Sequence, residues 1–391
     1  MQKFKLFVLL LLIFSFGLKL NALTPEEILG IVGNNPTIQV MEKESDYDVL
    51  IQQSANSLSA PEIDFEHLWG KGGERKWSLG ITQNFEWPGI YSIRKKIIHQ
   101  NQITNKYKVD AARLEIKLQA AQLLVKLMYN QKRLEMLHDM ITDMEEINKN
   151  LDHVLDFGQI TILDKKKANI ETTTLKIECD NLYQNQLALK AELEKLTVTK
   201  VNFDEIEWIM PYAFTLNNFD SYISDIDKDP TLLAYTSINK SAMLSREEST
   251  NSSLPGFGVG YRHEKEEGIH FNGFSLSLNL PNWNTNKKRK AAETFISAKH
   301  TDIEAHKTLL YTRIETEYDR ARTLRTNLVE LHNGGLDGTY LSLMKEAYQG
   351  GELSLLDYIR EQSYYRSVNI EMLALQEAYA ELLVSLNRYQ L

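Results

Sequence analysis

The stretch Gly158-Gln-Ile-Thr-Ile-Leu-Asp164 returns later in the chain as Gly351-Glu-Leu-Ser-Leu-Leu-Asp357. Three further landmarks return at nearly the same separation: Asn35-Pro36 as Asp229-Pro230, Pro61 as Pro255, and Phe85-Glu-Trp-Pro88 as Leu278-Asn-Leu-Pro281. One such match is easily accidental, but four matches in the same order are not. The sequence therefore indicates two copies of one long unit, a duplication and not a solenoid of short repeats.

Each unit follows the same plan. A helix is expected at roughly 36–57 and again at 230–250, followed by two short strands. A very long helical stretch comes next, at roughly 90–197 and 286–390, and one break interrupts each stretch at its glycine motif. We expect a first repeat at 23–200, a linker at 201–228 and a second repeat at 229–391.

The strand segments show strict alternation. In the first repeat Trp77, Leu79 and Ile81 alternate with small polar residues, and in the second Phe274, Leu276 and Leu278 do the same. A period of two predicts strands with one apolar and one polar face. We expect hairpins at about 61–87 and 255–280, with turns at 70–73 and 264–268.

Two interpretations of these strands remain open: a half-buried sheet in a soluble domain, or membrane-spanning strands. Runs of about 9–11 residues match a tilted bilayer span. Aromatic residues that would suit a membrane interface are Trp69, Trp87, Tyr261 and Trp283. Four strands cannot close a barrel, and an open edge in lipid leaves backbone groups unpaired, so three chains would have to combine twelve strands.

The long helices are rich in good helix formers, as in Ala111–Met144 and Thr301–Leu331. Sixty helical residues extend about 90 Å, which is more than a small globular core can cover. Such rods predict a coiled coil or the packed wall of a tunnel.

The N-terminus has the layout of a secretory signal peptide, a basic start and a short apolar run, which we place at residues 1–22. No later run of about 18 apolar residues predicts a membrane helix, and the net charge of −9 argues against nucleic acid. We find no acid–base, nucleophile, cofactor-binding or metal constellation, and so predict no enzyme and no cofactor. His263 and His270 flank an expected turn and are interpreted as surface histidines and not as a metal site.

The order of these landmarks resembles the TolC-type outer membrane factors, a family of outer membrane efflux proteins. The resemblance covers nearly the whole mature chain, and Trp87-Pro88-Gly89 is similar to the metal- and drug-efflux (CusC/CzcC-like) branch. It implies a mixed α and β membrane protein. Each protomer gives four strands to a 12-stranded trimeric transmembrane β-barrel, and its long helices form a periplasmic helical barrel. On this resemblance Trp77, Leu79, Ile81, Phe274, Leu276 and Leu278 face lipid.

The resemblance also implies a site at the periplasmic tip. The turns at Gly158 and Gly351 dock an adaptor, Asp164 and Tyr348 latch a pore gate, and Asp357 forms an acidic ring. Arg360 either pairs with Asp357 or weakens that ring. The alternatives are that Asp164 and Asp357 are helix N-caps and that Tyr348 is an ordinary packed aromatic.

The function implied is a homotrimeric outer-membrane channel, a passive export duct for small molecules or metal ions. An inner-membrane pump would drive it through a periplasmic adaptor, or membrane fusion protein. Two alternatives stay open: a duct for type I protein secretion, and a soluble periplasmic coiled-coil scaffold.

Overall fold

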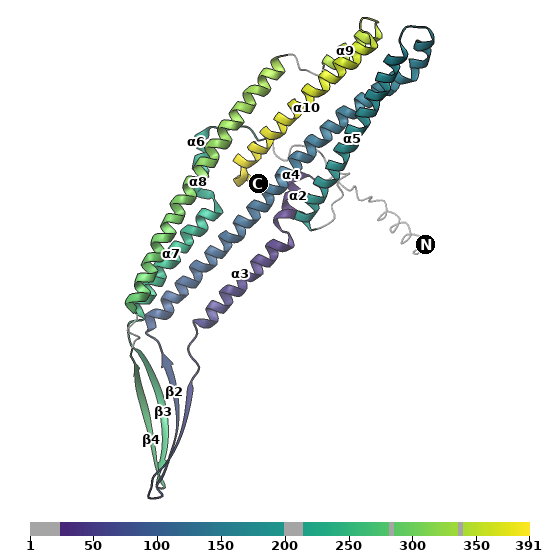
Figure 1. Cartoon of the computed structure of the whole chain (residues 1–391). Coiled ribbons are helices and arrows are strands. Elements are labelled where there is room, and N and C mark those ends of the chain that lie inside the picture. The colour runs from purple at the N-terminus through teal and green to yellow at the C-terminus, as the bar shows by residue number, and fades with distance from the viewer. Residues whose placement is uncertain (1–23, 199–213, 281–284, 335–338) are drawn as a thin grey trace, which may run out of the picture. The chain divides into compact units, whose positions relative to one another are not determined.

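The computed structural model describes residues 24–198, 214–280, 285–334 and 339–391, and consists of long helices and one four-stranded sheet (Figure 1). This confirms the expected mixed α and β fold. The signal peptide, Trp283 and residues 201–213 of the 201–228 linker lie outside the described residues. Among the described helices, none is both long and apolar enough to cross a membrane.

The elements follow one another twice in a similar order. The first series is α2 (Pro25–Gly33), α3 (Pro36–Ala55), β1 (Glu62–Trp69), β2 (Arg75–Phe85), α4 (Pro88–Asp156) and α5 (Ile162–Thr197). The second is α6 (Phe219–Ser224), a 3-10 helix (Asp225–Lys228), α7 (Pro230–Asn251), β3 (Gly256–Glu266), β4 (Ile269–Asn279), α8 (Thr285–Asn333), α9 (Thr339–Gln349), α10 (Leu355–Leu386) and a final 3-10 helix (Arg388–Gln390).

The expectation of a single break in the second long stretch was wrong. Helix α8 ends at Asn333 and α9 begins at Thr339, so this stretch is interrupted before it reaches Gly351. The sequence carries the reason in Asn333-Gly334-Gly335, because glycine disfavours helix interiors by about 1 kcal/mol. The equivalent part of α4 has no such pair and runs on without a break.

The chain divides into two compact units, and each draws on both halves of the sequence. One unit combines the N-terminal segment to Asn35 with Leu114–Asn218 and Thr316–Leu391; the other combines Pro36–Arg113 with Phe219–Glu315. Helices α4 and α8 contribute residues to both units. We describe them as the helical unit and the strand unit.

In the strand unit, the sheet has the order β1-β2-β3-β4, and every neighbouring pair is antiparallel. The β3–β4 turn is shorter than expected, because β3 continues to Glu266 and pairs it with Ile269. Glu267 and Gly268 alone form the turn, with φ of 47° and 86°. Positive φ at both positions is the type I′ geometry, which matches the twist of a two-residue hairpin.

The two aligned proline landmarks mark helix starts. Pro230 follows Asp229, whose side chain accepts a hydrogen bond from the Leu232 amide at the start of α7. Pro36 likewise begins α3 directly after Asn35. Proline suits the first turn of a helix because its missing N–H would have no intrahelical partner there.

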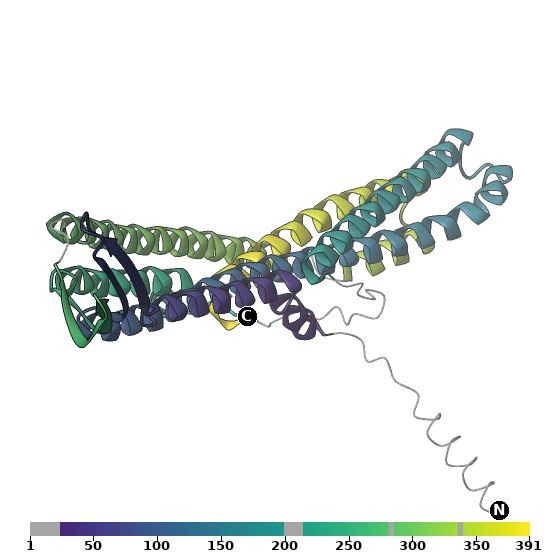
Figure 2. The same ribbon diagram turned by 90° about the horizontal axis from the view of Figure 1, so that it is seen from below.

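The helical unit has two apolar cores, formed where α4 packs with its neighbours. Figures 1 and 2 show α4 and α5 side by side up to the turn that joins them. The first core lies among α2, α4, α5 and α10, around Leu127 and Leu193. The second lies among α4, α5, α9 and α10, around Met140, Leu175 and Tyr358. Apolar burial between helices, and not helix propensity alone, holds these long elements together.

Candidate functional site

The turn between α4 and α5 is a defined helix stop. Gly158 has φ of 71°, in the left-handed region that glycine enters without strain. Its amide donates to the Leu155 carbonyl, and the Gln159 amide donates to the Val154 carbonyl. These bonds form a Schellman motif, which satisfies carbonyls left free at a helix end.

The turn between α9 and α10 repeats this geometry. Gly351 has φ of 76°, its amide donates to the Tyr348 carbonyl, and the Glu352 amide donates to the Ala347 carbonyl. The glycine that recurs in the sequence repeat therefore forms a Schellman motif at the end of a helix in both repeats.

The recurring aspartates begin the returning helices, but they are not the N-caps considered from sequence. The N-caps are Thr161 and Ser354, whose hydroxyls accept hydrogen bonds from the amides of Asp164 and Asp357. Asp164 Oδ2 accepts in return from the Thr161 amide at 2.9 Å, which completes a capping box. The signal was present in Thr161-x-x-Asp164 and Ser354-x-x-Asp357, the spacing of a capping box.

The capping contacts fix the charge state of Asp164. The hydrogen bond from the Thr161 backbone lowers the pKa of Asp164 below its usual 3.8, with a further contribution from the Thr161 hydroxyl. Asp164 is therefore an anion near neutral pH, and its carboxylate also complements the positive end of the α5 dipole.

Asp357 and Arg360 lie in contact. Arg360 Nη2 is 2.5 Å from Asp357 Oδ1, one turn along α10, while Asp357 Oδ2 accepts from the Ser354 hydroxyl at 2.7 Å. Arg360 remains largely exposed. An exposed pair of this kind contributes only about 0.2–1 kcal/mol to stability, but it neutralises much of the local charge of Asp357.

Tyr348 packs against Tyr358, with ring centroids 4.8 Å apart. Burial raises the pKa of the Tyr348 phenol. Among the described residues, the hydrogen bonds recorded for the Asp164 side chain go to Thr161 and none goes to Tyr348. The fold of a single chain thus does not bring this expected pair together.

Tyr358 is a residue that the sequence did not single out. It is 1 % exposed, and its hydroxyl has no hydrogen-bond partner. Burial, together with nearby Asp143, raises the pKa of Tyr358 to about 12. The ring lines a cavity of about 150 Å³ that Asp143, Lys345 and Tyr348 also line, so a polar group stands unsatisfied inside the second core.

Ion pairs connect α9 and α10 to the α4–α5 pair. Lys345 Nζ on α9 lies 2.5 Å from Asp143 Oδ1 on α4. On α10, Arg366 Nη1 lies 2.6 Å from Glu171 Oε1 of α5, and Arg366 is only 13 % exposed. These partners are far apart in sequence, so no local pattern could reveal them.

The α4–α5 turn carries exposed apolar side chains. Phe157 is 78 % exposed, and Ile162 and Leu163 are each more than half exposed. These three large apolar residues lie in the turn and at the start of α5, and exposed apolar patches mark contact sites in many proteins.

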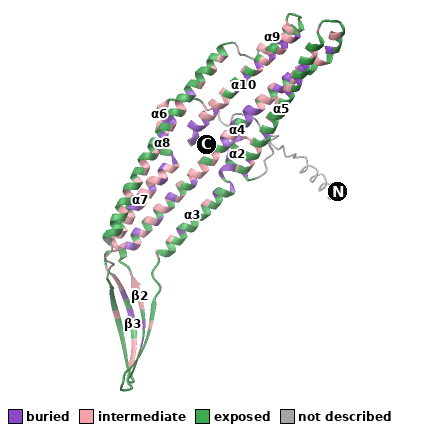
Figure 3. Cartoon of the chain, in the orientation of Figure 1, coloured by how far each residue is buried: buried purple, intermediate pink, exposed green. Residues whose placement is uncertain are grey.

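The sheet of the strand unit has two chemically different faces. The register puts Ile63, Ile81, Tyr261 and Phe274 in one cross-strand row. The next row toward the β3–β4 turn holds Phe65, Leu79, His263 and Asn272, so this face becomes polar on β3 and β4 near that turn. Phe274 and Leu276 are 89 % and 83 % exposed, and Leu278 is also exposed. Trp77 lies on this face but is half-buried, and Tyr261 lies within β3 and not at its end. Figure 3 shows that much of the sheet consists of exposed residues, which are coloured green.

The opposite face is small and polar. A Cβ at Gly258 would come within 2.3 Å of Ser277 Oγ and 2.5 Å of Asn84 Oδ1. Gly260 is crowded in the same way by Ser275 and Thr82. Glycine is needed here because the neighbouring polar side chains occupy the space beside the backbone.

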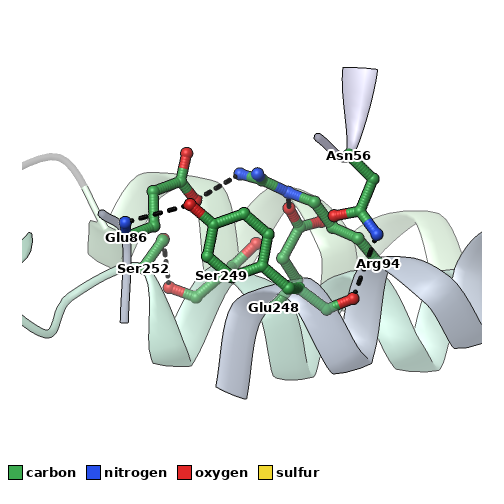
Figure 4. A network of polar contacts seen from close by, with 7 residues as sticks. Asn56, Glu86, Arg94, Glu248, Ser249 and Ser252 are labelled. Atoms are coloured by element: carbon green, nitrogen blue, oxygen red, sulfur yellow. Dashed lines mark hydrogen bonds and ion pairs between the residues drawn. The ribbon is translucent and has the colours of Figure 1, made fainter. Parts of the chain in front are cut away.

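A polar network joins the segment after β2 to α4, which follows it, and to α7, which precedes β3 (Figure 4). Arg94 of α4 pairs with Glu86 at 2.9 Å and with Glu248 of α7 at 2.6 Å. Asn56 donates to the Tyr91 carbonyl, and the Tyr91 hydroxyl accepts from the Glu86 amide. These bonds hold the segment after β2 against the beginning of α4 and the end of α7.

The comparisons with known proteins identify the fold. No protein-family model and no curated protein matches the sequence. Solved structures do match: OprN, an outer-membrane channel, at a TM-score of 0.73 and 10% identity, over 93% of this chain and 89% of that one. CusC matches at 0.72 and 10% identity, over 93% and 91%. The Campylobacter jejuni CmeC outer membrane channel matches at 0.71 and 14% identity, over 93% and 84%. The chain therefore has the fold of these outer-membrane channel proteins.

Proposed function

We propose that three copies of this chain form a channel of the TolC type in the outer membrane, with a barrel of twelve strands. The observation that carries the proposal is the sheet, which is apolar and exposed on one face and small and polar on the other. An exposed apolar face of this size is solvated well by lipid and poorly by water. The polar face would then line a water-filled lumen.

The open edges of the sheet support the trimer. Within the described chain, β1 and β4 each pair on one side only. In lipid, every unpaired backbone group costs several kcal/mol, so the edges must be joined to other strands. Pairing β4 of one copy with β1 of the next removes all the edges at once.

The long helices then form the periplasmic part of the channel. The neighbours by fold include CmeC, an outer membrane channel, and CusC, which forms a transmembrane channel. We extend that role to this chain: a passive duct with no catalysis of its own, which an inner-membrane pump drives through a periplasmic adaptor. The two sequence repeats, 23–200 and 229–391, would be the duplicated halves of each wall.

The turns at Gly158 and Gly351 are proposed as the adaptor-docking site at the periplasmic tip. The exposed side chains of Phe157, Ile162 and Leu163 support this, since a partner would cover them. Asp164, Tyr348, Asp357 and Arg360 are proposed as gate residues, with contacts between neighbouring copies supplying the latch. Pairing of Asp357 with Arg360 weakens an acidic ring, so strong cation selectivity is not expected.

The test of the channel is its location and its conductance. The full chain should fractionate with the outer membrane, run as a heat-modifiable trimer after detergent extraction, and conduct ions in a planar bilayer. Recovery as a monomer from the soluble periplasmic extract would refute the channel and favour the coiled-coil scaffold. Identifying the adaptor by cross-linking at Phe157→Cys would separate small-molecule efflux from type I protein secretion.

The gate is tested by separating charge from helix capping. Asp164→Asn keeps a capping acceptor and removes the charge, whereas Thr161→Ala removes the N-cap and keeps the charge. If the Asp164 charge latches the tip, single-channel conductance rises in Asp164→Asn and stays unchanged in Thr161→Ala. Equal conductance in both variants and the parent would leave Asp164 with its capping role alone.

A further inference from the structure

Two histidine rings meet near the β3–β4 turn. His263 of β3 and His270 of β4 are diagonal neighbours, because His263 pairs with Asn272 and His270 lies two residues nearer the turn. Their ring centroids are 5.3 Å apart, and His270 Nδ1 lies 3.2 Å from His263 Nε2. The two-residue turn at Glu267 and Gly268 holds both strands in this register.

The other nitrogen of His263 is already occupied. His263 Nδ1 lies 2.7 Å from Asn272 Oδ1, and the same oxygen accepts from the Tyr261 hydroxyl at 2.7 Å. Because an amide oxygen only accepts, His263 Nδ1 carries the proton and Nε2 keeps its lone pair. Histidines that bind metals are oriented in this way, with the second nitrogen donating to an oxygen.

His263 Nε2 and His270 Nδ1 form a hydrogen bond with each other, and their spacing also fits one metal ion that would replace the proton between them. With Zn–N bonds of about 2.0–2.1 Å, two nitrogens of a tetrahedral zinc site lie about 3.3 Å apart. The geometry points to a site for a divalent transition-metal ion such as Zn²⁺ between His263 Nε2 and His270 Nδ1. Water completes the coordination, because the described residues offer no group of three or more His, Cys, Asp or Glu side chains that could hold a metal.

The charges around the pair set its affinity. Lys265 is the direct cross-strand partner of His270 and lies on the same face, where its ammonium opposes a bound cation. With only two protein ligands, we expect binding to be weaker than in closed four-ligand sites.

The site needs only the hairpin, so it does not rest on the proposed channel. We would titrate the detergent-extracted full chain with Zn²⁺ in competition with a chromophoric chelator. The expected result is one Zn²⁺ per chain. His263→Gln and His270→Gln should each weaken binding by about tenfold or more, and Asn272→Ala by about tenfold. Lys265→Gln should tighten it, because the change removes a positive charge beside the bound ion.

The matched control is His67→Gln. This histidine lies on the same face, in the row of Trp77, Lys265 and His270, but its ring contacts Trp69. It should leave stoichiometry and affinity unchanged. Absence of Zn²⁺ binding in the parent chain, or equal affinity in the His263→Gln/His270→Gln double variant, would overturn the proposal.

A second measurement guards against a misfolded variant. The Trp77 ring lies 5.4 Å from that of His263, so Cu²⁺ in the site should quench Trp77 fluorescence. The quenched component should disappear in Trp77→Phe and in His270→Gln, with the circular dichroism spectrum unchanged. Equal quenching in parent and His270→Gln would also count against the site.

Discussion

Replacing Leu276 with arginine tests the lipid-facing assignment most directly. Leu276 is 83 % exposed in the single chain and occupies the middle of the apolar row on β4, between Phe274 and Leu278. Moving an arginine to the middle of a bilayer costs about 2–4 kcal/mol. Loss of the leucine side chain from lipid adds roughly 1–2 kcal/mol, scaled from full burial by that exposure. The expected cost is about 3–6 kcal/mol per chain, applied three times in a trimer.

The matched control is Ser277→Arg, at the next residue and on the opposite face. Gly258 is the direct cross-strand partner of Ser277, so an arginine at position 277 meets no Cβ on the neighbouring strand at that position. Both variants would be refolded into lipid vesicles and unfolded with urea, with heat-modifiable migration as the readout. Leu276→Arg should lose trimer while Ser277→Arg keeps it. Equal trimer yields in the two variants would refute the assignment of the two faces.

Further predictions concern the helical unit. Gly158→Ala should destabilise the α4–α5 turn by about 1–2 kcal/mol, since alanine resists positive φ. Gly158→Asn should destabilise the turn less than Gly158→Ala, because asparagine adopts positive φ more readily. Cross-linking to the adaptor from Phe157→Cys in each background reports the docking geometry. Tyr358→Phe removes a buried hydroxyl without a partner and should raise the stability of the fold by roughly 1 kcal/mol; a lower midpoint of thermal unfolding would show that the hydroxyl is satisfied. Because the folded pKa of Asp164 is lowered, its stabilising effect is present above the usual carboxyl pKa of 3.8 and is lost as the pH falls through the lowered value; amide exchange at the start of α5 should accelerate there, and less so in Thr161→Ala.

The fold was readable from sequence where its signals are local and periodic. The alternation from Trp77 to Phe85 predicts a strand because side chains on successive residues point to opposite faces. The glycine motifs predict helix stops because few other residues adopt positive φ. The S/T-x-x-D spacing also indicated the N-caps Thr161 and Ser354, although the sequence analysis considered the aspartates themselves as caps.

The remaining features depend on register and on contacts between distant segments. The pairing of Lys345 with Asp143 requires α9 to pack on α4 in one particular axial register. The hydrophobic periodicity of the two helices does not specify that register. His263 and His270 were interpreted as surface residues because only the register set by the two-residue turn brings their rings into contact. Had residues 264–268 formed the longer turn expected, the two side chains would not be diagonal neighbours.

In the proposed trimer, the unpaired edges of β1 and β4 make assembly the last step of each chain's own folding. A protomer then completes its backbone hydrogen bonding only when two others arrive, so the yield of finished channel must rise steeply with the amount of chain supplied. Before assembly, each copy exposes two unpaired edge strands, which can pair with strands of other chains and cause aggregation. Refolding at low chain concentration should therefore accumulate unassembled protomers. Mutations that only stabilise the individual protomer should not restore the yield of trimer.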